Sequence, residues 1–343
     1  MAASLFTALA VVAPSGRAVD SAQDGPPGAA RACSPWVRID GFSDELDKTA
    51  FSGVPVSELS GVTEDAAGRL LVVADDSYEF ELDARTRRPV AVLPLAYSDG
   101  TGLDAEAIAV DRDGTRLISD ETQPSVNRFS PSGRYLGSLP VPDSLKVAQR
   151  ATRNLTFEGM ALLAGKHVLV ASMEGALKED GPDIRRLQTW ERSGRSGSFR
   201  LGPQYALQSD PGLDISDITS TPDGRLLVVE RGYTAGAGNT VRLYLADPRR
   251  ASDVSATPTV RAGQEGLRLV RTTLLADIAD CPSLGATTTQ PQPNPLLDNI
   301  EGVTVTGRAP GGRLELLLLS DDNGRSTQIT RLYSLTARLP EVF

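Results

Sequence analysis

The sequence predicts an all-β fold, and three of its features support that prediction. Short apolar runs rich in Val, Leu, Ile and Thr recur along the chain, while aromatic residues make up only 5 % of it. Most runs are paired across a glycine-containing turn, as in antiparallel hairpins. No long amphipathic helical pattern separates the runs, which disfavours a parallel sheet with alternating helices.

One hairpin pattern occurs five times. An apolar strand opens on a small or acidic residue, turns at a glycine, and returns as a strand that ends in carboxylates. The five copies open at Ser60, Glu106, Glu158, Ser216 and Glu301. An antiparallel hairpin brings its two ends together, so the opening and closing acids of each copy should lie at one end. The repeat therefore predicts a ring of acids.

The spacing of the copies predicts the number of sheets. The openings are 46, 52, 58 and 85 residues apart, and the first three steps match a propeller blade of four strands. The last step is long enough for one more blade, for which residues 241–246 and 267–275 supply strand-like runs. We therefore expect a six-bladed β-propeller in a single domain over residues 33–343.

The turns and strands within each copy agree with this fold. The turns at residues 67–69, 113–115, 164–166, 223–225 and 311–313 all contain glycine, which supplies the positive φ that tight hairpins need. The runs at 70–73, 226–229 and 314–319 are apolar throughout, apart from Glu315 in the third run. We expect these strands to be covered on both faces by neighbouring blades.

The net charge of the chain is −9, from 35 basic and 44 acidic residues. A nucleic acid is a poor partner for such a chain, because proteins that bind its phosphate backbone usually carry a basic face. Metal cations or cationic ligands fit the acidic balance better, and ordinary solubilising charge is the alternative explanation.

The N-terminal segment resembles an incomplete export signal. Residues 5–14 are apolar, but no Lys or Arg precedes them, and residues 15–32 are rich in Ala, Gly, Pro and Asp. We expect residues 1–32 to be a signal or leader segment that is processed or disordered, and the protein to be secreted or extracytoplasmic. No later run is long enough to cross a bilayer. We also expect a monomer.

The two cysteines, Cys33 and Cys281, flank nearly the whole folded region. In an exported protein a disulfide between them would tie the N-terminal segment to the last part of the ring. Two unrelated buried thiols are the alternative.

Several motifs together resemble a known family. They are Glu-Gly-Met-Ala within residues 154–161, Ser-Asp-Glu at 119–121, Glu-Arg-Gly at 230–232, and Asn-Ile-Glu-Gly at 299–302 with Ser-Asp-Asp-Asn at 320–323. This set resembles the bacterial "esterase-like activity of phytase" family, over residues 57–335. The resemblance implies a propeller that hydrolyses an ester or phosphoester. The calcium-dependent phytases proper, six-bladed propellers with a carboxylate-lined, calcium-filled cleft, are similar in architecture only.

The predicted ring of acids could hold a metal ion. Crowded carboxylates either take up protons or bind a cation, and oxygen ligands without His or Cys favour calcium or magnesium. We expect calcium, because its flexible coordination suits a ring assembled from separate blades, with Asn299 and Asn323 as further ligands. Alternatively, these acids cap turns and keep strand edges soluble. The metal candidates are Glu106, Asp120, Glu121, Glu158, Glu174, Glu230, Glu301, Asp321 and Asp322, with Asp75, Asp76 and Asp217 as secondary candidates.

A bound calcium would let an acidic cleft accept an ester, because it bridges substrate oxygens and lowers the pKa of a coordinated water. We predict that Glu158 or Glu301 takes the proton and that Arg231 holds the phosphate or ester oxyanion. Arg153, Lys178 and Arg325 are further cations that could do so. Each of these basic residues could equally be a solvated surface charge.

Other hydrolytic mechanisms find little support. The only histidine, His167, follows a glycine turn and lies away from the acidic hairpin ends, which disfavours a Ser-His-Asp triad. Residues 193–197 do not fit the Gly-x-Ser-x-Gly pattern, and no phosphate-binding loop, dinucleotide fingerprint or cysteine metal site is present.

The sequence thus predicts an exported, calcium-dependent, hydrolase-like propeller that acts on a small phosphate or carboxylic ester. A calcium-dependent lactonase-like hydrolase is one alternative. The other is a non-catalytic binding propeller, in which the metal is structural and loops such as residues 282–295 hold a partner.

Overall fold

Five four-stranded antiparallel sheets form the protein, so the prediction of six blades is wrong. The computed structural model describes residues 31–194 and 197–341, which belong to one unit. The expected leader, apart from Arg31 and Ala32, lies outside the described residues. Within them, no helix has the length and hydropathy that a membrane crossing requires.

Each of the first four blades consists of four consecutive strands. Blade one contains β4 (Leu59–Glu64), β5 (Leu70–Ala74), β6 (Tyr78–Leu82) and β7 (Pro89–Pro94). Blade two contains β8 (Ile108–Val110), β9 (Arg116–Asp120), β10 (Ser125–Phe129) and β11 (Tyr135–Ser138). Blade three contains β12 (Phe157–Leu162), β13 (Val168–Met173), β14 (Ile184–Glu191) and β15 (Arg200–Gln208). Blade four contains β16 (Asp214–Ser220), β17 (Leu226–Thr234), β18 (Gly238–Asp247) and β19 (Arg271–Asp277).

Blade five joins the two ends of the propeller. It contains β20 (Asn299–Ala309), β21 (Arg313–Asp321), β22 (Leu332–Ala337) and, from the start of the chain, β1 (Val37–Ser43). β1 pairs antiparallel with β22, with Val37 opposite Ala337. The short hairpin β2 (Ala50–Phe51) and β3 (Val54–Pro55) and the 3₁₀ turns η2 (Asp143–Leu145), η3 (Ile278–Asp280) and η4 (Pro310–Gly312) lie between the blade strands.

The long last step of the repeat does not contain a sixth blade. The run at 241–246 lies in β18, and the run at 267–275 leads into and includes most of β19, so both complete blade four. Residues 278–298 then connect to blade five without adding a blade strand. The long loop between β18 and the outer strand β19 explains the extra length of this last step.

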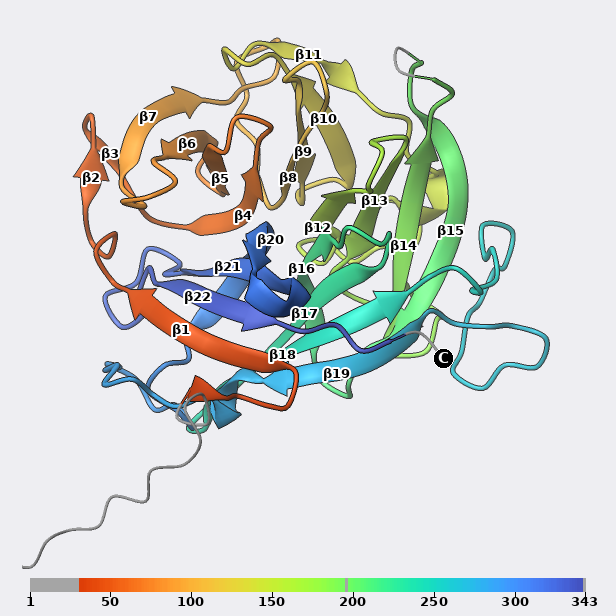
Figure 1. Cartoon of the computed structure of the whole chain (residues 1–343). Coiled ribbons are helices and arrows are strands. Elements are labelled where there is room, and N and C mark those ends of the chain that lie inside the picture. The colour runs from red at the N-terminus through yellow and green to blue at the C-terminus, as the bar shows by residue number, and fades with distance from the viewer. Residues whose placement is uncertain (1–30, 195–196, 342–343) are drawn as a thin grey trace, which may run out of the picture. The chain divides into compact units, whose positions relative to one another are not determined.

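The innermost strands of the five blades surround a common axis (Figure 1). They are β4, β8, β12, β16 and β20, and each contacts the innermost strand of the next blade, with β20 returning to β4. The predicted continuous apolar strands are buried: Leu70 to Val73 and Leu226 to Val229 are all 0 % exposed. Apolar clusters between adjacent blades hold the ring together.

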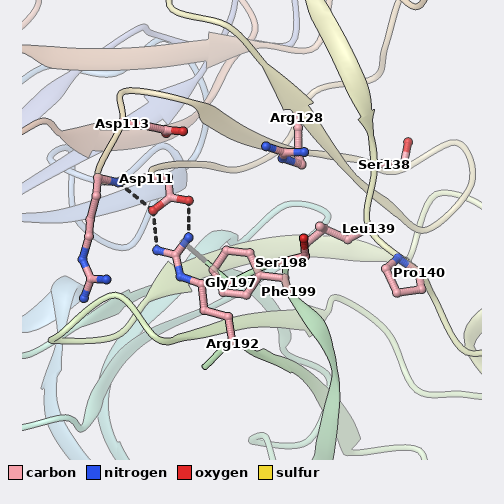
Figure 2. Close-up of a pocket in the computed structure, with 11 residues that line it drawn as sticks. Asp111, Asp113, Arg128, Ser138, Leu139, Pro140, Arg192, Gly197, Ser198 and Phe199 are labelled. Carbon is pink, nitrogen blue, oxygen red and sulfur yellow. Dashed lines mark hydrogen bonds and ion pairs between the residues drawn. The ribbon is translucent and has the colours of Figure 1, made fainter. Parts of the chain in front are cut away.

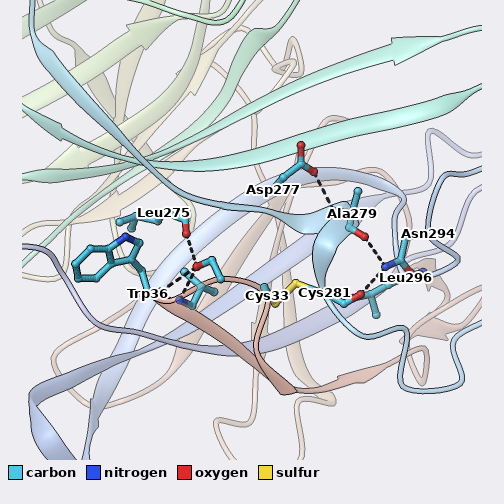
Figure 3. Close-up of a disulfide and its surroundings, with 10 residues drawn as sticks. Cys33, Trp36, Leu275, Asp277, Ala279, Cys281, Asn294 and Leu296 are labelled. Atoms are coloured by element: carbon cyan, nitrogen blue, oxygen red, sulfur yellow. Dashed lines mark hydrogen bonds between the residues drawn. A yellow bond between two sulfur atoms is a disulfide. The ribbon is translucent and has the colours of Figure 1, made fainter. Parts of the chain in front are cut away.

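The predicted disulfide between Cys33 and Cys281 is confirmed (Figure 3). It joins the segment before β1 to the segment after η3. The adjacent Ser34 hydroxyl donates a hydrogen bond to the carbonyl of Leu275 at 2.5 Å, and the Asn294 amide donates to the carbonyl of Cys281 at 2.6 Å. The bridge therefore fastens the region where the ring closes.

Candidate functional site

The recurrent opening residue sits in an irregularity of the innermost strand. The strand register shifts between Phe157 and Gly159, and again between Ile300 and Gly302, so Glu158 and Glu301 occupy β-bulges. Equivalent shifts occur around Ser60 in β4 and Ser216 in β16. A bulge leaves one residue unpaired and redirects its side chain. This local feature explains how four of the blades present their opening residues at one end of the hairpins, whereas Glu106 of blade two lies just before β8.

The glycine after the opening acid allows close approach of the neighbouring blade. A Cβ at Gly159 would lie 2.6 Å from the backbone nitrogen of Ile218 in blade four, and one at Gly302 would lie 2.5 Å from the carbonyl of Ser60 in blade one. No larger residue fits there without moving a backbone. The Glu-Gly pairs therefore combine an acid of the converging cluster with a tight contact between blades.

Carboxylates from several blades converge at this end of the ring. Oxygens of Glu106, Glu121 and Glu158 lie within 4.8 Å of one another, and those of Asp75, Asp104 and Glu106 form a second such group. The charge of Glu301 raises the pKa of Glu174, Asp321 and Glu121. Glu174, Glu301 and Asp321 therefore belong to the same electrostatic cluster. We call these residues the acid ring: Asp75, Asp104, Glu106, Glu121, Glu158, Glu174, Glu301 and Asp321.

The acid ring favours protonated or metal-bound carboxylates. Burial, reinforced by the neighbouring acids, raises the pKa of Glu106 and Glu158 well above the usual range. Burial and Asp104 raise the pKa of Glu121 to about 7, although hydrogen bonds with the backbone N–H of Thr156 and with Glu174 oppose the rise. The ring can therefore relieve its repulsion by taking up protons or a cation.

Two members of the acid ring have no hydrogen-bond partner among the described residues. Glu106 and Glu158 are only 8 % and 4 % exposed, and the carboxylate of neither accepts a hydrogen bond there. Buried charges are normally paired or coordinate a metal. These two side chains are therefore the members of the ring that most need a proton or a cation.

Other members are held by polar neighbours. The Asn299 amide donates to Glu301 Oε1 at 2.9 Å and to Asp321 at 3.3 Å. The Ser60 hydroxyl donates to Asp75 at 2.6 Å and lies 3.3 Å from Glu301 Oε2. These bonds fix one side of the ring.

Arg231 is the cation of the site. Its guanidinium lies 2.9 Å from Glu301 and 3.5 Å from Glu174. Burial would lower its pKa, but the nearby carboxylates, Glu301 first, raise it above the ordinary value. Arg231 therefore remains charged and offsets part of the negative charge.

Three of the predicted metal ligands have other partners. Asp322 accepts hydrogen bonds from Lys48, Ser57 and the backbone of Glu58. Asp120 accepts one from the Tyr97 hydroxyl at 2.6 Å. Glu230 is on β17 next to Arg231, but its carboxylate accepts a hydrogen bond from the backbone N–H of Asp210 at 2.9 Å. Adjacent strand residues face opposite sides, which separates Glu230 from the acid ring.

The secondary candidates also differ in position. Asp75 belongs to the acid ring, whereas Asp76 is exposed. Asp217 accepts backbone hydrogen bonds from Ile218 at 2.7 Å and from Val303 at 2.8 Å, and it also bonds the backbone of Met160. These donors belong to blades three, four and five, so Asp217 links three blades.

The remaining predicted cations lie around the site or away from it. Arg325 lines a cavity beside the ring, and Arg153 is exposed near Asp104. Lys178 is exposed. Its backbone N–H donates a hydrogen bond to the carbonyl of Arg150, and its carbonyl accepts one from the Arg150 guanidinium. His167 contacts Arg112, on a turn at the opposite ends of the hairpins, as expected for a residue outside the acid ring.

A cavity of about 280 Å³ adjoins the acid ring. Glu301 belongs to both, and its partners Arg231 and Asn299 also line the cavity, so a molecule in the cavity would touch the ring. The other lining residues are mostly polar: Tyr233, Asn239, Gln290, Asn323, Arg325 and Gln328.

A larger cavity of about 430 Å³ lies elsewhere, between blades two and three (Figure 2). It contains Asp111 and Asp113 of the β8–β9 turn, at the opposite end of that hairpin from Glu106 and Glu121. Arg192 pairs with Asp111 there and packs over the Phe199 ring. Arg112 and Arg128 also line this cavity, which is separate from the acid ring.

Sequence reasoning missed several residues of the site. Asp104 lies two residues before Glu106 in an extended segment, so the spacing could have indicated it. Asn239, Gln290 and Gln328 come from three separate segments, and no sequence pattern connects them. Only the folded chain brings these amides together.

Comparisons with known proteins agree with the motifs. Three similar solved structures are a protein described as a candidate gluconolactonase (16 % identity, 83 % of this chain and 76 % of that one, TM-score 0.42), the WD40 repeats of RRP9 (13 %, 90 % and 99 %, 0.42), and a catalytically inactive virginiamycin B lyase from Staphylococcus aureus bound to quinupristin (10 %, 83 % and 68 %, 0.38). Similarity at this level says nothing about the activity of this chain. No curated protein matches the chain. The model of the phytase-like family, described as esterase-like activity of phytase, matches residues 54–324, and the chain belongs to that family.

Proposed function

We propose that this protein is an exported hydrolase that uses the acid ring and a divalent cation, calcium, to cleave a phosphate or carboxylic ester. The observation that carries the proposal is the pair of buried, unpartnered carboxylates of Glu106 and Glu158, grouped with Glu121 and close to Arg231. Membership of a family described by esterase-like activity supports the reaction class. The disulfide is compatible with export.

The residues fit a hard cation. Glu106, Glu121 and Glu158 supply carboxylate oxygens from two blades, and Asp75 and Asp104 extend the group around Glu106. The donor set contains no His or Cys, which favours calcium or magnesium over zinc. A bound cation of this kind polarises an ester oxygen and acidifies water.

The side chains of the ring have distinct roles in this proposal. Glu158 has no competing partner, so it can hold the cation or accept the proton of the attacking water. Glu301 is bonded to Asn299 and Arg231, which suits it to holding Arg231 in place. Arg231 stabilises the negative charge that develops on the phosphate or carbonyl oxygen. Water adds to the phosphorus or carbon atom, the ester bond to oxygen breaks, and the leaving alcohol receives a proton.

The test is turnover of p-nitrophenyl acetate, p-nitrophenyl phosphate and phytate with calcium or with a chelator. We expect calcium-dependent turnover of at least one substrate, and Glu158→Gln should lose more than about 100-fold in kcat/KM. Glu191→Gln, an exposed acid at the end of β14, is the matched control and should behave like the wild type.

The outcomes discriminate between functions. If the protein binds calcium but turns over none of the esters, it is a binding propeller with a structural metal and not a hydrolase. Turnover that is unaffected by both the chelator and Glu158→Gln would overturn the proposed site.

A further inference from the structure

We propose that the cavity beside the acid ring binds a hydroxyl-rich, sugar-like part of the substrate that carries at most one negative charge. This inference rests on the proposed function in treating the bound molecule as the substrate. The binding itself can be tested without any turnover.

The position of the cavity links it to the reaction. It shares Arg231, Asn299 and Glu301 with the site, so a ligand in it places a neighbouring ester at the acids. Its volume of about 280 Å³ is just below the usual range for sites that hold drug-sized ligands. It therefore suits a molecule of the size of a single monosaccharide.

The lining residues have unused hydrogen-bonding atoms. Arg231 Nε, Asn239 Nδ2, Gln290 Nε2 and Gln328 Oε1 are buried and have no hydrogen-bond partner in the described part of the chain. Asn239 and Gln328 are only 2 % and 8 % exposed. Each unsatisfied buried group costs roughly 1–3 kcal/mol. Four such groups around one cavity indicate that a ligand supplies their partners.

The type of these groups indicates the chemistry of the ligand. Side-chain amides both donate and accept hydrogen bonds, and so do hydroxyl groups. Tyr233, which is 58 % exposed, adds an aromatic surface to the same wall. A molecule with several hydroxyl groups and an apolar ring face matches both features.

The charge around the cavity limits the charge of the ligand. Arg231 is already paired with Glu174 and Glu301. Arg325 is exposed and forms no ion pair with the described residues, which leaves it as the cation available to the ligand. The adjoining acids would repel a polyanion. The cavity therefore suits a ligand with one anionic group and disfavours a polyphosphate.

The experiment is ligand-observed NMR titration of the full chain with D-gluconate, D-glucose and cyclohexanecarboxylate, in buffer containing calcium. Gluconate has hydroxyl groups and one charge, glucose lacks the charge, and cyclohexanecarboxylate lacks the hydroxyl groups. We expect gluconate to bind most tightly, glucose more weakly, and cyclohexanecarboxylate at least tenfold more weakly than gluconate.

Variants locate the binding. Tyr233→Ala and Gln328→Ala should each weaken gluconate binding about three- to tenfold. Arg325→Ala should weaken gluconate but leave glucose unchanged. The matched control is Arg308→Ala, an exposed arginine of β20 without an ion pair to the described residues. Because Tyr233 and Arg325 are exposed, their variants keep the test valid if Gln328→Ala does not fold.

Two results would overturn the inference: cyclohexanecarboxylate binding as tightly as gluconate, or gluconate binding that Tyr233→Ala and Arg325→Ala leave unchanged. Failure of the hydrolase proposal looks different. In that case gluconate binds in the cavity, but no ester is turned over.

Discussion

Individual side chains give the acid ring its pH dependence. Burial raises the pKa of Glu121 to about 7 and that of Glu106 and Glu158 well above the usual range, so protons compete with a cation for these oxygens. We predict that calcium affinity rises with pH through about 7 and that binding releases protons. Calorimetry in buffers of different ionisation enthalpy measures both. Affinity that is constant between pH 6 and 8 would contradict the prediction.

Glu230 provides a separate test at the residue scale. Burial raises its pKa to about 7, so the folded protein binds this proton more tightly than the unfolded chain does. Its contribution to the free energy of unfolding is therefore full below about pH 4.5 and is lost as the pH rises to about 7. We predict that Glu230→Gln gains roughly 1–3 kcal/mol relative to the wild type between these pH values. Urea unfolding at pH 5 and pH 8 measures the difference, and a parallel pH dependence of the two proteins would refute it.

The bulge and the following glycine are the element that positions Glu158 and Glu301. We predict that Gly159→Ala destabilises the fold by about 1–3 kcal/mol, because its Cβ would clash with the backbone of Ile218. Gly41→Ala is the control, since a Cβ at Gly41 meets nothing within 4 Å. Thermal unfolding compares the two. Equal midpoints for both variants would mean that the contact between blades tolerates a methyl group.

The sequence predicted the hairpins and most of the acid ring, because glycine turns and recurrent acids are local signals. It could not separate Glu230 from Arg231 or recognise that Asp217 bonds backbone groups of three blades, because those contacts form between distant segments. It also gave one blade too many, because β18 and β19 are separated by a long loop that length alone cannot distinguish from a blade.

At the scale of the whole molecule, β1 closes the propeller by pairing with β22, and the disulfide holds the segment before β1 in place. The bridge spans 248 residues, and its loss should cost about 3–5 kcal/mol. We predict that Cys33→Ser/Cys281→Ser lowers the unfolding midpoint and reduces the hydrogen-exchange protection of β1 and β22 before that of blades two and three. Uniform loss of protection across all five blades would argue against a closure-specific role.

The central claim is that the blades bring their acids together to bind a hard cation. The most direct measurement is the thermal unfolding midpoint of the full chain at pH 8 with a chelator and with calcium at about 100 times its Kd. We predict a rise of about 3–6 °C with calcium, from roughly 2.7 kcal/mol of linkage, and no rise in Glu158→Gln. An unchanged wild-type midpoint, with no calcium retained by the protein, would contradict the account.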